Sequence, residues 1–520
     1  MTQSARAVRI WPYLTGVLLG LICGFALFFY LGARHIDDRT RELVVRELAN
    51  RFDSRVELKS LHVDLTPRMQ VTGEDLTLYS HDRSDVPPLI HIESFRFNLG
   101  VLGIVHVPRH INGVYVENVT VTIPPRQRQT GESYENRGTN RALPRVIFDE
   151  IVCNDTQLII LPKKQGKDPL SFDIHDLVLK SVDAAKRFDF HGNLTNAKPK
   201  GEIATKGTFG PWDPEEPGDT HVSGSYQFSD ADLGPFPGIA GTLSSTGRYK
   251  GQLNRLEVEG ETDTPNFSLD PVARPVPLHT EFSATVDGTD GDTYLHPVRA
   301  TLLHSLIIAN GSVIRSSSKS GHLIALEITA PKARLQDILL LATKSNQPLM
   351  SGDVTVKAKM LLSPGRQKVI DRLNLDGRFG VADAEFASTE VRDKLESLSR
   401  HALGKPNNED AGSAITDLSG SFQFARSTAT FKNLDFSVPG VLIKLDGSYD
   451  LRSEGLDFHG DLRMRAKLSQ TVTGPKSVFL KFVDPFFKKE GAGSVVPIRI
   501  YGTRDNPKFG LALFKKSAKN

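Results

Sequence analysis

The chain has little cysteine and little net charge, and each shortage excludes a class of protein. It contains two cysteines in 520 residues, Cys23 and Cys153, which are too few for a disulfide framework. Its formal net charge is only +3, which is too balanced for a protein that binds nucleic acid. Neither a phosphate-binding glycine loop nor a paired-cysteine zinc pattern occurs. We therefore expect no metal, no cofactor and no nucleic-acid partner.

Three stretches come close to a known site and fail to match it. His106 and His110 have the spacing of a metal-binding helix, but Pro108 between them breaks that geometry. Residues 287–292 resemble a calcium loop, yet threonine and glycine stand at two of its ligand positions, so we expect a surface turn. Residues 241–247 lack the Gly-x-Ser-x-Gly order of a nucleophile elbow. Without a catalytic constellation, we expect that the protein is not an enzyme.

One apolar run is long enough to cross a bilayer as a helix, at residues 10–33. Aromatic residues stand near both of its ends, where membrane interfaces favour them. It is longer than the apolar part of a signal peptide and has no evident cleavage site, so we expect an uncleaved anchor. A mild excess of positive charge before the run favours a cytoplasmic N-terminus. Asp37-Asp38 can then cap an amphipathic helix that runs through Arg51. This helix either joins the anchor to the body or closes the lower end of the body.

Short stretches in which apolar and polar residues alternate recur along the chain, and each skips two polar positions before it resumes. Alternation with a period of two indicates a strand with one apolar and one polar face. A skip of two moves the later apolar residues to the other face, unless the strand bends there, as at a bulge. The skipped pairs are all polar and contain no glycine: Lys59-Ser60, Glu74-Asp75, Glu93-Ser94, Glu117-Asn118, His175-Asp176 and Lys432-Asn433.

These skips predict bent strands rather than hairpins, because tight two-residue hairpin turns favour glycine. Bent strands side by side form a sheet that curls into a trough with an apolar concave face. An ordinary β-sandwich, in which the same apolar face is packed core, also fits the pattern. The residues that would line a trough are Val56, Leu58, Leu61, Val63, Ile90, Ile92, Phe95, Phe97, Val114, Val116, Val119, Val121, Phe431, Leu434 and Phe436.

The rest of the chain is mainly strand-like. Its 43 glycines and 30 prolines are spread as many short strands with turns require. Further strand-like stretches are 282–286, 300–308, 323–328, 354–360 and 496–502. Apolar residues at helical spacing predict two short helices, at 390–400 and at 478–487. The fold class we expect is mainly β, with one N-terminal transmembrane helix, a long curled antiparallel sheet that forms an open groove, and a few short helices.

The chain resembles the AsmA-like family of Gram-negative envelope proteins. The anchor, short helix and alternating strands resemble that family's N-terminus, and residues 207–260 are similar to its repeated Gly-x-aromatic-x-aromatic strands. Residues 447–451, 462–468, 483–487 and 496–503 resemble its C-terminal domain. The resemblance implies a long β-groove that stands in the periplasm from the inner membrane. Larger members are held to carry phospholipid acyl chains toward the outer membrane, whereas the founding member was associated with outer-membrane protein assembly.

The resemblance also implies an organisation along the chain. The expected segments are a cytoplasmic tail (1–9), a transmembrane anchor (10–33), a helix with strand repeats (34–123), a basic loop (124–145), a middle β-groove (146–380), an AsmA-like C-terminal region with two helices (381–514) and a basic tail (515–520).

We therefore expect an inner-membrane protein, with its bulk in the periplasm, that binds and passes lipid, such as phospholipid, in outer-membrane biogenesis. The alternative is a non-enzymatic scaffold or assembly factor for envelope proteins without lipid cargo, which predicts a packed sandwich. Phe479, Phe482 and Phe486 on the last helix are candidates for contact with a membrane or a partner protein. The same helix could instead be a plug packed on the last strands.

Overall fold

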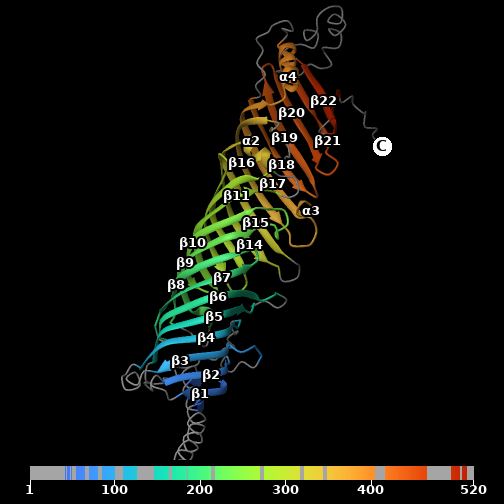
Figure 1. Cartoon of the computed structure of the whole chain (residues 1–520). Coiled ribbons are helices and arrows are strands. Elements are labelled where there is room, and N and C mark those ends of the chain that lie inside the picture. Colours follow the sequence, from blue (N-terminus) through green and yellow to red (C-terminus); the bar gives the residue numbers. More distant parts are fainter. Residues whose placement is uncertain are drawn as a thin grey trace, which may run out of the picture. The chain divides into compact units, whose positions relative to one another are not determined.

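The chain divides into two compact units, and the described residues of both are mainly in β-strands (Figure 1). Unit 1 comprises residues 1–163, 169–195 and 204–224, and unit 2 comprises residues 164–168, 196–203 and 225–520. The computed structural model describes residues 41–42, 44–46, 48–49, 54–64, 69–79, 85–99, 109–125, 146–162, 167–183, 186–211, 217–269, 274–316, 321–342, 348, 350–403, 416–464, 494–503 and 506–511. Strands account for 73% of these residues, which confirms the mainly β prediction.

Among its described residues, unit 1 contains six whole strands. The next three strands along the chain have residues in both units. The unit 1 strands are β1 (Val56–Asp64), β2 (Met69–Leu78), β3 (Ile90–Leu99), β4 (Arg109–Ile123), β5 (Val146–Ile160) and β6 (Leu170–Val182). The divided strands are β7 (Phe188–Ala197), β8 (Lys200–Phe209) and β9 (His221–Asp232), with a short helix η1 (Pro217–Asp219) before β9.

The described part of unit 2 continues with strands of 6 to 14 residues and three helices. Its strands are β10 (Thr242–Gln252), β11 (Arg255–Phe267), β12 (Val276–Asp287), β13 (Asp292–Leu302), β14 (Ser305–Arg315), β15 (His322–Arg334), β16 (Met350–Leu362), β17 (Leu373–Phe386), β18 (Thr416–Ala425), β19 (Thr428–Val438), β20 (Val441–Asp450), β21 (Gly455–Met464), β22 (Ser494–Thr503) and β23 (Asn506–Leu511). Its helices are α2 (Leu335–Ala342), α3 (Val369–Arg372) and α4 (Thr389–Ala402).

In each unit the strands form an open, curled sheet in which chain neighbours pair (Figure 1). The prediction of an antiparallel sheet is correct for the strands on either side, where β3 pairs with β4 and β5 with β6, but wrong for β4 and β5, which pair in parallel. A parallel pair needs a long crossover connection, because the chain must return to the end where the first strand began. The polar stretch between Ile123 and Val146 supplies that length, although residues 126–145 lie outside the described part.

The skipped pairs of unit 1 lie inside strands, which confirms bent strands and excludes hairpins. Leu58 pairs with Leu76 and Ser60 with Glu74, so the register does not change across the kink. The same skip occurs in each strand from β1 to β6, at the same row of the sheet. From β1 to β6 the kink is therefore one continuous crease without an extra residue in any one strand. It ends at β6, where the register against β7 shifts between Ile174 and Asp176. At Lys432-Asn433 in unit 2, by contrast, β19 does carry an extra residue, because its register shifts there.

The crease depends on residues that accept a left-handed backbone. Asp75, Asn118 and Asp155 have φ values of 58°, 52° and 53°, a region that asparagine and aspartate enter more readily than other residues with a side chain. The Asn118 side chain also donates a hydrogen bond from Nδ2 to Glu93 Oε2 at 2.5 Å. This combination keeps the apolar residues before and after each skip on one face.

We predict that Asn118→Val lowers the free energy of unfolding by about 1–2 kcal/mol, because a β-branched residue is strained at positive φ. Thr120→Val, two residues along the same strand and outside the crease, is the matched control and should change stability by less than about 0.5 kcal/mol. Urea unfolding of the two variants measures the difference. Equal stabilities would show that the left-handed residues do not maintain the crease.

The helix predicted at 390–400 is confirmed as α4, and the described residues between 41 and 49 are helical, as predicted for the stretch after Asp37-Asp38. Residues 300–308 were predicted as one strand, which is wrong: β13 ends at Leu302 and β14 begins at Ser305. Leu303, with a φ of 53°, occupies the turn without any glycine, so no local signal marks it.

Several predicted segments lie outside the described residues. They are the anchor at 10–33 with the tail before it, the helix at 478–487 with Phe479, Phe482 and Phe486, and the tail at 515–520. Among the helices that the structure describes, none combines the length and the apolar character that crossing a bilayer requires.

Candidate functional site

The apolar stripes of unit 1 match from strand to strand and form one face. Pairing brings into one row Leu61, Gly73, Phe95, Val116, Cys153 and Leu177, each opposite the next. The twelve predicted lining residues of this unit, from Val56 to Val121, occupy this face in the same way. Residues between them, such as Glu57, Arg96 and Tyr115, are exposed on the other face. The twelve side chains therefore share one face of the sheet, and whether that face binds lipid stays a prediction.

A helix covers the β1 and β2 end of this face. Val44 and Val45 pack against Leu58 and Leu61, and Leu48 and Ala49 pack against Val56. Val56, Leu58 and Leu61 keep only 6–7% of their surface exposed. These three predicted lining residues are therefore core beneath a helix, which closes the end of the face at β1.

Farther along unit 1 the apolar face is partly open. Val114, Val116 and Val119 are buried, whereas Ile92 and Phe95 opposite them are half-buried. Cys153 lies among them with 7% of its surface exposed, and burial raises the pKa of its thiol to about 11. This cysteine is therefore a small apolar side chain of the face and not a nucleophile.

The apolar face of unit 2 extends over many neighbouring strands. One of its rows consists of Gly311, Leu326, Met360, Leu375, Phe424 and Ala429, each paired with the next. The residues one position away on either side form two rows on the opposite face. One row consists of Glu327, Lys359, Asp376 and Gln423, and the other of Ala325, Leu361 and Asn374. The two faces of the sheet therefore differ in polarity at the same level along the strands.

In β11 the apolar face is partly accessible to water. Along this strand, Leu256 and Val258 are half-buried while Glu257 and Glu259 are exposed, and no apolar residue is fully buried. The neighbouring strands also carry half-buried apolar residues, such as Phe282 of β12, although Ala284 keeps only 3% of its surface exposed. A sandwich core would bury the face of β11 as completely as that of β20, where Val441, Ile443 and Leu445 keep only 3–4% exposed. The face of β11 is therefore not sealed against a second layer.

Helices cover the apolar face toward the C-terminal strands. Leu395, Leu398 and Ala402 of α4 and Leu335 and Ile338 of α2 belong to the cluster that buries Val354, Val381 and the β20 residues. The predicted lining residues Leu434 and Phe436 pack against this cluster. They are therefore part of a packed core.

Phe431, the third predicted lining residue of unit 2, is half-buried. Its ring lies close to the ring of Phe458, and Gly447 lies on the strand between them. Gly447 of β20 pairs with Phe431 on one side and Phe458 on the other, and the two ring centroids are 5.9 Å apart. A Cβ on Gly447 would lie 2.5 Å from Phe458 Cδ1. The glycine thus leaves the space in which the two rings approach each other.

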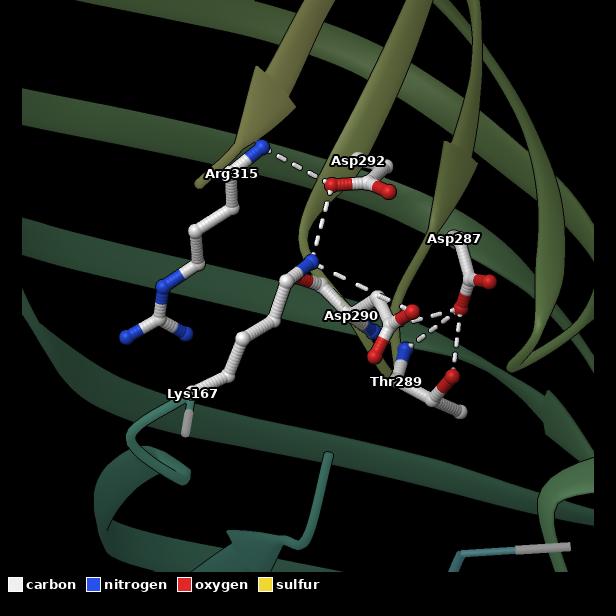
Figure 2. A network of polar contacts seen from close by, with 6 residues as sticks. All are labelled: Lys167, Asp287, Thr289, Asp290, Asp292 and Arg315. Carbon is white, nitrogen blue, oxygen red and sulfur yellow. Dashed lines mark hydrogen bonds and ion pairs between the residues drawn. The ribbon is translucent and has the colours of Figure 1, made fainter. Parts of the chain in front are cut away.

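The predicted surface turn at 287–292 is buried, which corrects that prediction (Figure 2). Asp287 Oδ1 accepts hydrogen bonds from the backbone and hydroxyl of Thr289, at 2.9 and 2.5 Å. Thr289, Asp290 and Asp292 keep only 4–5% of their surface exposed. The sequence could not show this, because the group that covers the turn, Lys167, lies more than 100 residues away.

Lys167 provides the positive charge that these carboxylates need. Its Nζ lies 3.1 Å from Asp292 Oδ1, 4.0 Å from Asp290 Oδ2 and 3.4 Å from the Asp290 carbonyl oxygen, and its side chain is 0% exposed. Asp292 Oδ1 also accepts a hydrogen bond from the Arg315 backbone at 2.9 Å. Among the described residues, no group of three or more histidine, cysteine, aspartate or glutamate side chains could hold a metal ion. The cluster is an ion pair that stabilises unit 2.

The prediction left out the apolar-face residues of β10 to β17, because these strands alternate without the skip that drew attention to the others. Simple alternation in 255–263 and 354–362 was the available signal. Comparisons with protein-family models, with curated proteins and with solved structures found no match, so the AsmA-like resemblance stays a prediction.

Proposed function

We propose that the protein binds lipid acyl chains on its apolar face and passes them along the sheet, anchored in the inner membrane by residues 10–33, in outer-membrane biogenesis. The observation that carries this proposal is the partly accessible apolar face of β11, together with the half-buried Phe282 on the neighbouring strand β12. Large accessible apolar surfaces mark sites that bind apolar partners.

The mechanism is passive. Each methylene group that moves from water to the apolar face gains about 0.8 kcal/mol, so a lipid chain is held without any specific polar contact. Leu256, Val258 and Phe282 offer such a surface from neighbouring strands. Since the surface repeats from strand to strand, a chain can move between equivalent positions. Phospholipid head groups stay at the lip, in water.

The second candidate function is a scaffold or assembly factor for envelope proteins without lipid cargo. The packed cluster under α2 and α4 favours it for the C-terminal strands, because Val438, Val441 and Ile443 are buried there as in an ordinary core. This reading requires that the face of β11 be covered by a protein partner in the cell.

We predict that a photo-crosslinking amino acid at Phe282 forms lipid adducts in living cells. The matched control is Glu281, the preceding residue, which is exposed on the opposite face of β12. Mass spectrometry of the purified full chain should detect phospholipid adducts at 282 at least tenfold above those at 281. Protein adducts at 282 without lipid would favour the scaffold, and equal lipid adducts at both positions would contradict the proposed face.

A further inference from the structure

The strands of unit 2 end at two rims, and the connections alternate between them. The connections after β10, β12, β14 and β16 lie on the first rim, because each consecutive pair is antiparallel. The connection before β10 and those after β11, β13 and β15 lie on the second rim. In a flat sheet these rims are separated by the length of a strand, about 35 Å for eleven residues.

The rims nevertheless touch. Gly238 lies in the connection before β10, on the second rim, and Val369 begins α3 on the first rim. A Cβ placed on Gly238 would be 2.9 Å from Val369 Cγ2. The curl of the sheet therefore brings the connection before β10 against the connection after β16.

Lys198 belongs to the second rim, where its Nζ lies 5.7 Å from the ring centroid of Phe236, beside Gly238. Lys198 also lies close enough to His322, at the first rim, to act on its charge: burial is the main cause that lowers the pKa of His322, followed by Arg315 and then Lys198. The third contact is the buried pair of Lys167 with Asp290 and Asp292, in the connection after β12 (Figure 2).

These contacts follow a regular order. Residues 167, 198 and 238 precede β6, β8 and β10, and they meet the connections after β12, β14 and β16 in turn. Moving two strands along the chain on the second rim, from β6 to β8 to β10, moves the contact two strands along on the first rim, from β12 to β14 to β16. A coiled sheet produces this order, whereas three unrelated loop contacts would not. We call this line of contacts the seam and define it by Lys167, Lys198, Gly238, Asp292, His322 and Val369.

We propose that the seam closes the apolar face of this part of unit 2 into a laterally sealed passage, so that a lipid chain enters and leaves it lengthwise. The closure itself is independent of cargo, whereas the lengthwise movement rests on the proposed function. Opening the seam would break the buried contacts of Lys167 with Asp290 and Asp292, together with the packing of Gly238 against Val369. The seam is therefore a wall, and not a gate through which lipid could move sideways.

A disulfide across the seam tests the closure. Gly238→Cys with Val369→Cys, in the full chain with Cys23→Ser, should oxidise in air to more than 80%, with each single variant as the control. Because Gly238 has a φ of +93°, a side chain there is strained, and a second pair keeps the test independent of folding. Lys198→Cys with His322→Cys should be joined by a short bismaleimide. Failure of both pairs to link, in protein that remains folded by circular dichroism, would overturn the seam.

The locked protein then tests the direction of movement. Lipid adducts at a photo-crosslinking residue in place of Phe282 should change less than twofold between the oxidised and the reduced Gly238→Cys/Val369→Cys protein. A loss of fivefold or more on oxidation would show that lipid enters through the seam, and would overturn lengthwise passage. If the disulfide forms but neither state yields lipid adducts, the proposed function and lengthwise passage fail while the seam stands.

Discussion

Lys167→Met is expected to lower the free energy of unfolding of unit 2 by about 3–5 kcal/mol, the range for removing one partner of a buried ion pair. The side chain of Lys167 is fully buried, and those of Asp290 and Asp292 are 5% and 7% exposed. Methionine fills most of the same volume but leaves both carboxylates without a counter-charge. Urea unfolding, followed by hydrogen exchange of peptides from β12 and β13, measures the loss.

Two controls separate charge from packing. Lys250→Met removes an ion pair of similar length, 3.3 Å to Glu257, whose side chains are 74% and 60% exposed. It should cost less than about 1 kcal/mol, because exposed pairs contribute little. Lys167→Met combined with Asp292→Asn should recover part of the loss, since asparagine can still accept the hydrogen bond from the Arg315 backbone. Equal losses for Lys167→Met and Lys250→Met would show that the buried pair does not hold this region.

The local features of the fold were predictable from the sequence because they depend on neighbouring residues. Alternation defined the strands, and the polar pairs without glycine marked the crease, where Asn118 and its equivalents turn the backbone. The helix α4 followed from apolar residues at helical spacing. The face of the predicted lining residues in unit 1 was correct for the same reason, since a kinked strand keeps its apolar side.

The features that were missed depend on residues far apart in the chain. The parallel pair of β4 and β5 depends on how the crossover returns, and the burial of the 287–292 turn depends on Lys167. Helix α2 follows β15 directly, so its leucine-rich sequence reads as a continuation of the strand. Whether Leu434 lines a trough or a core depends on α2 and α4 being folded over it. A pattern of one strand contains none of this information.

Three carboxylates in one row of the apolar face are expected to abolish lipid binding while the protein still folds. Leu326→Glu, Met360→Glu and Leu375→Glu replace half-buried residues that pair across β15, β16 and β17. Three strands span about 14 Å, which is roughly the length of ten methylene groups. Loss of their apolar contact removes up to about 8 kcal/mol, whereas about 1.4 kcal/mol already lowers binding tenfold. Lipid adducts at position 282 should therefore fall more than tenfold.

The opposite face supplies a control with the same charge in the same strands. Ala325→Glu, Leu361→Glu and Asn374→Glu form the matching row one residue away, and Leu361 and Asn374 are already exposed. This variant should keep its lipid adducts within twofold of the unmodified protein, because its carboxylates remain in water. Circular dichroism and urea unfolding of both variants show whether each is folded. If the two triple variants lose lipid equally, charge alone causes the loss and the apolar face is not the binding surface; if neither loses it, lipid is bound elsewhere on the chain.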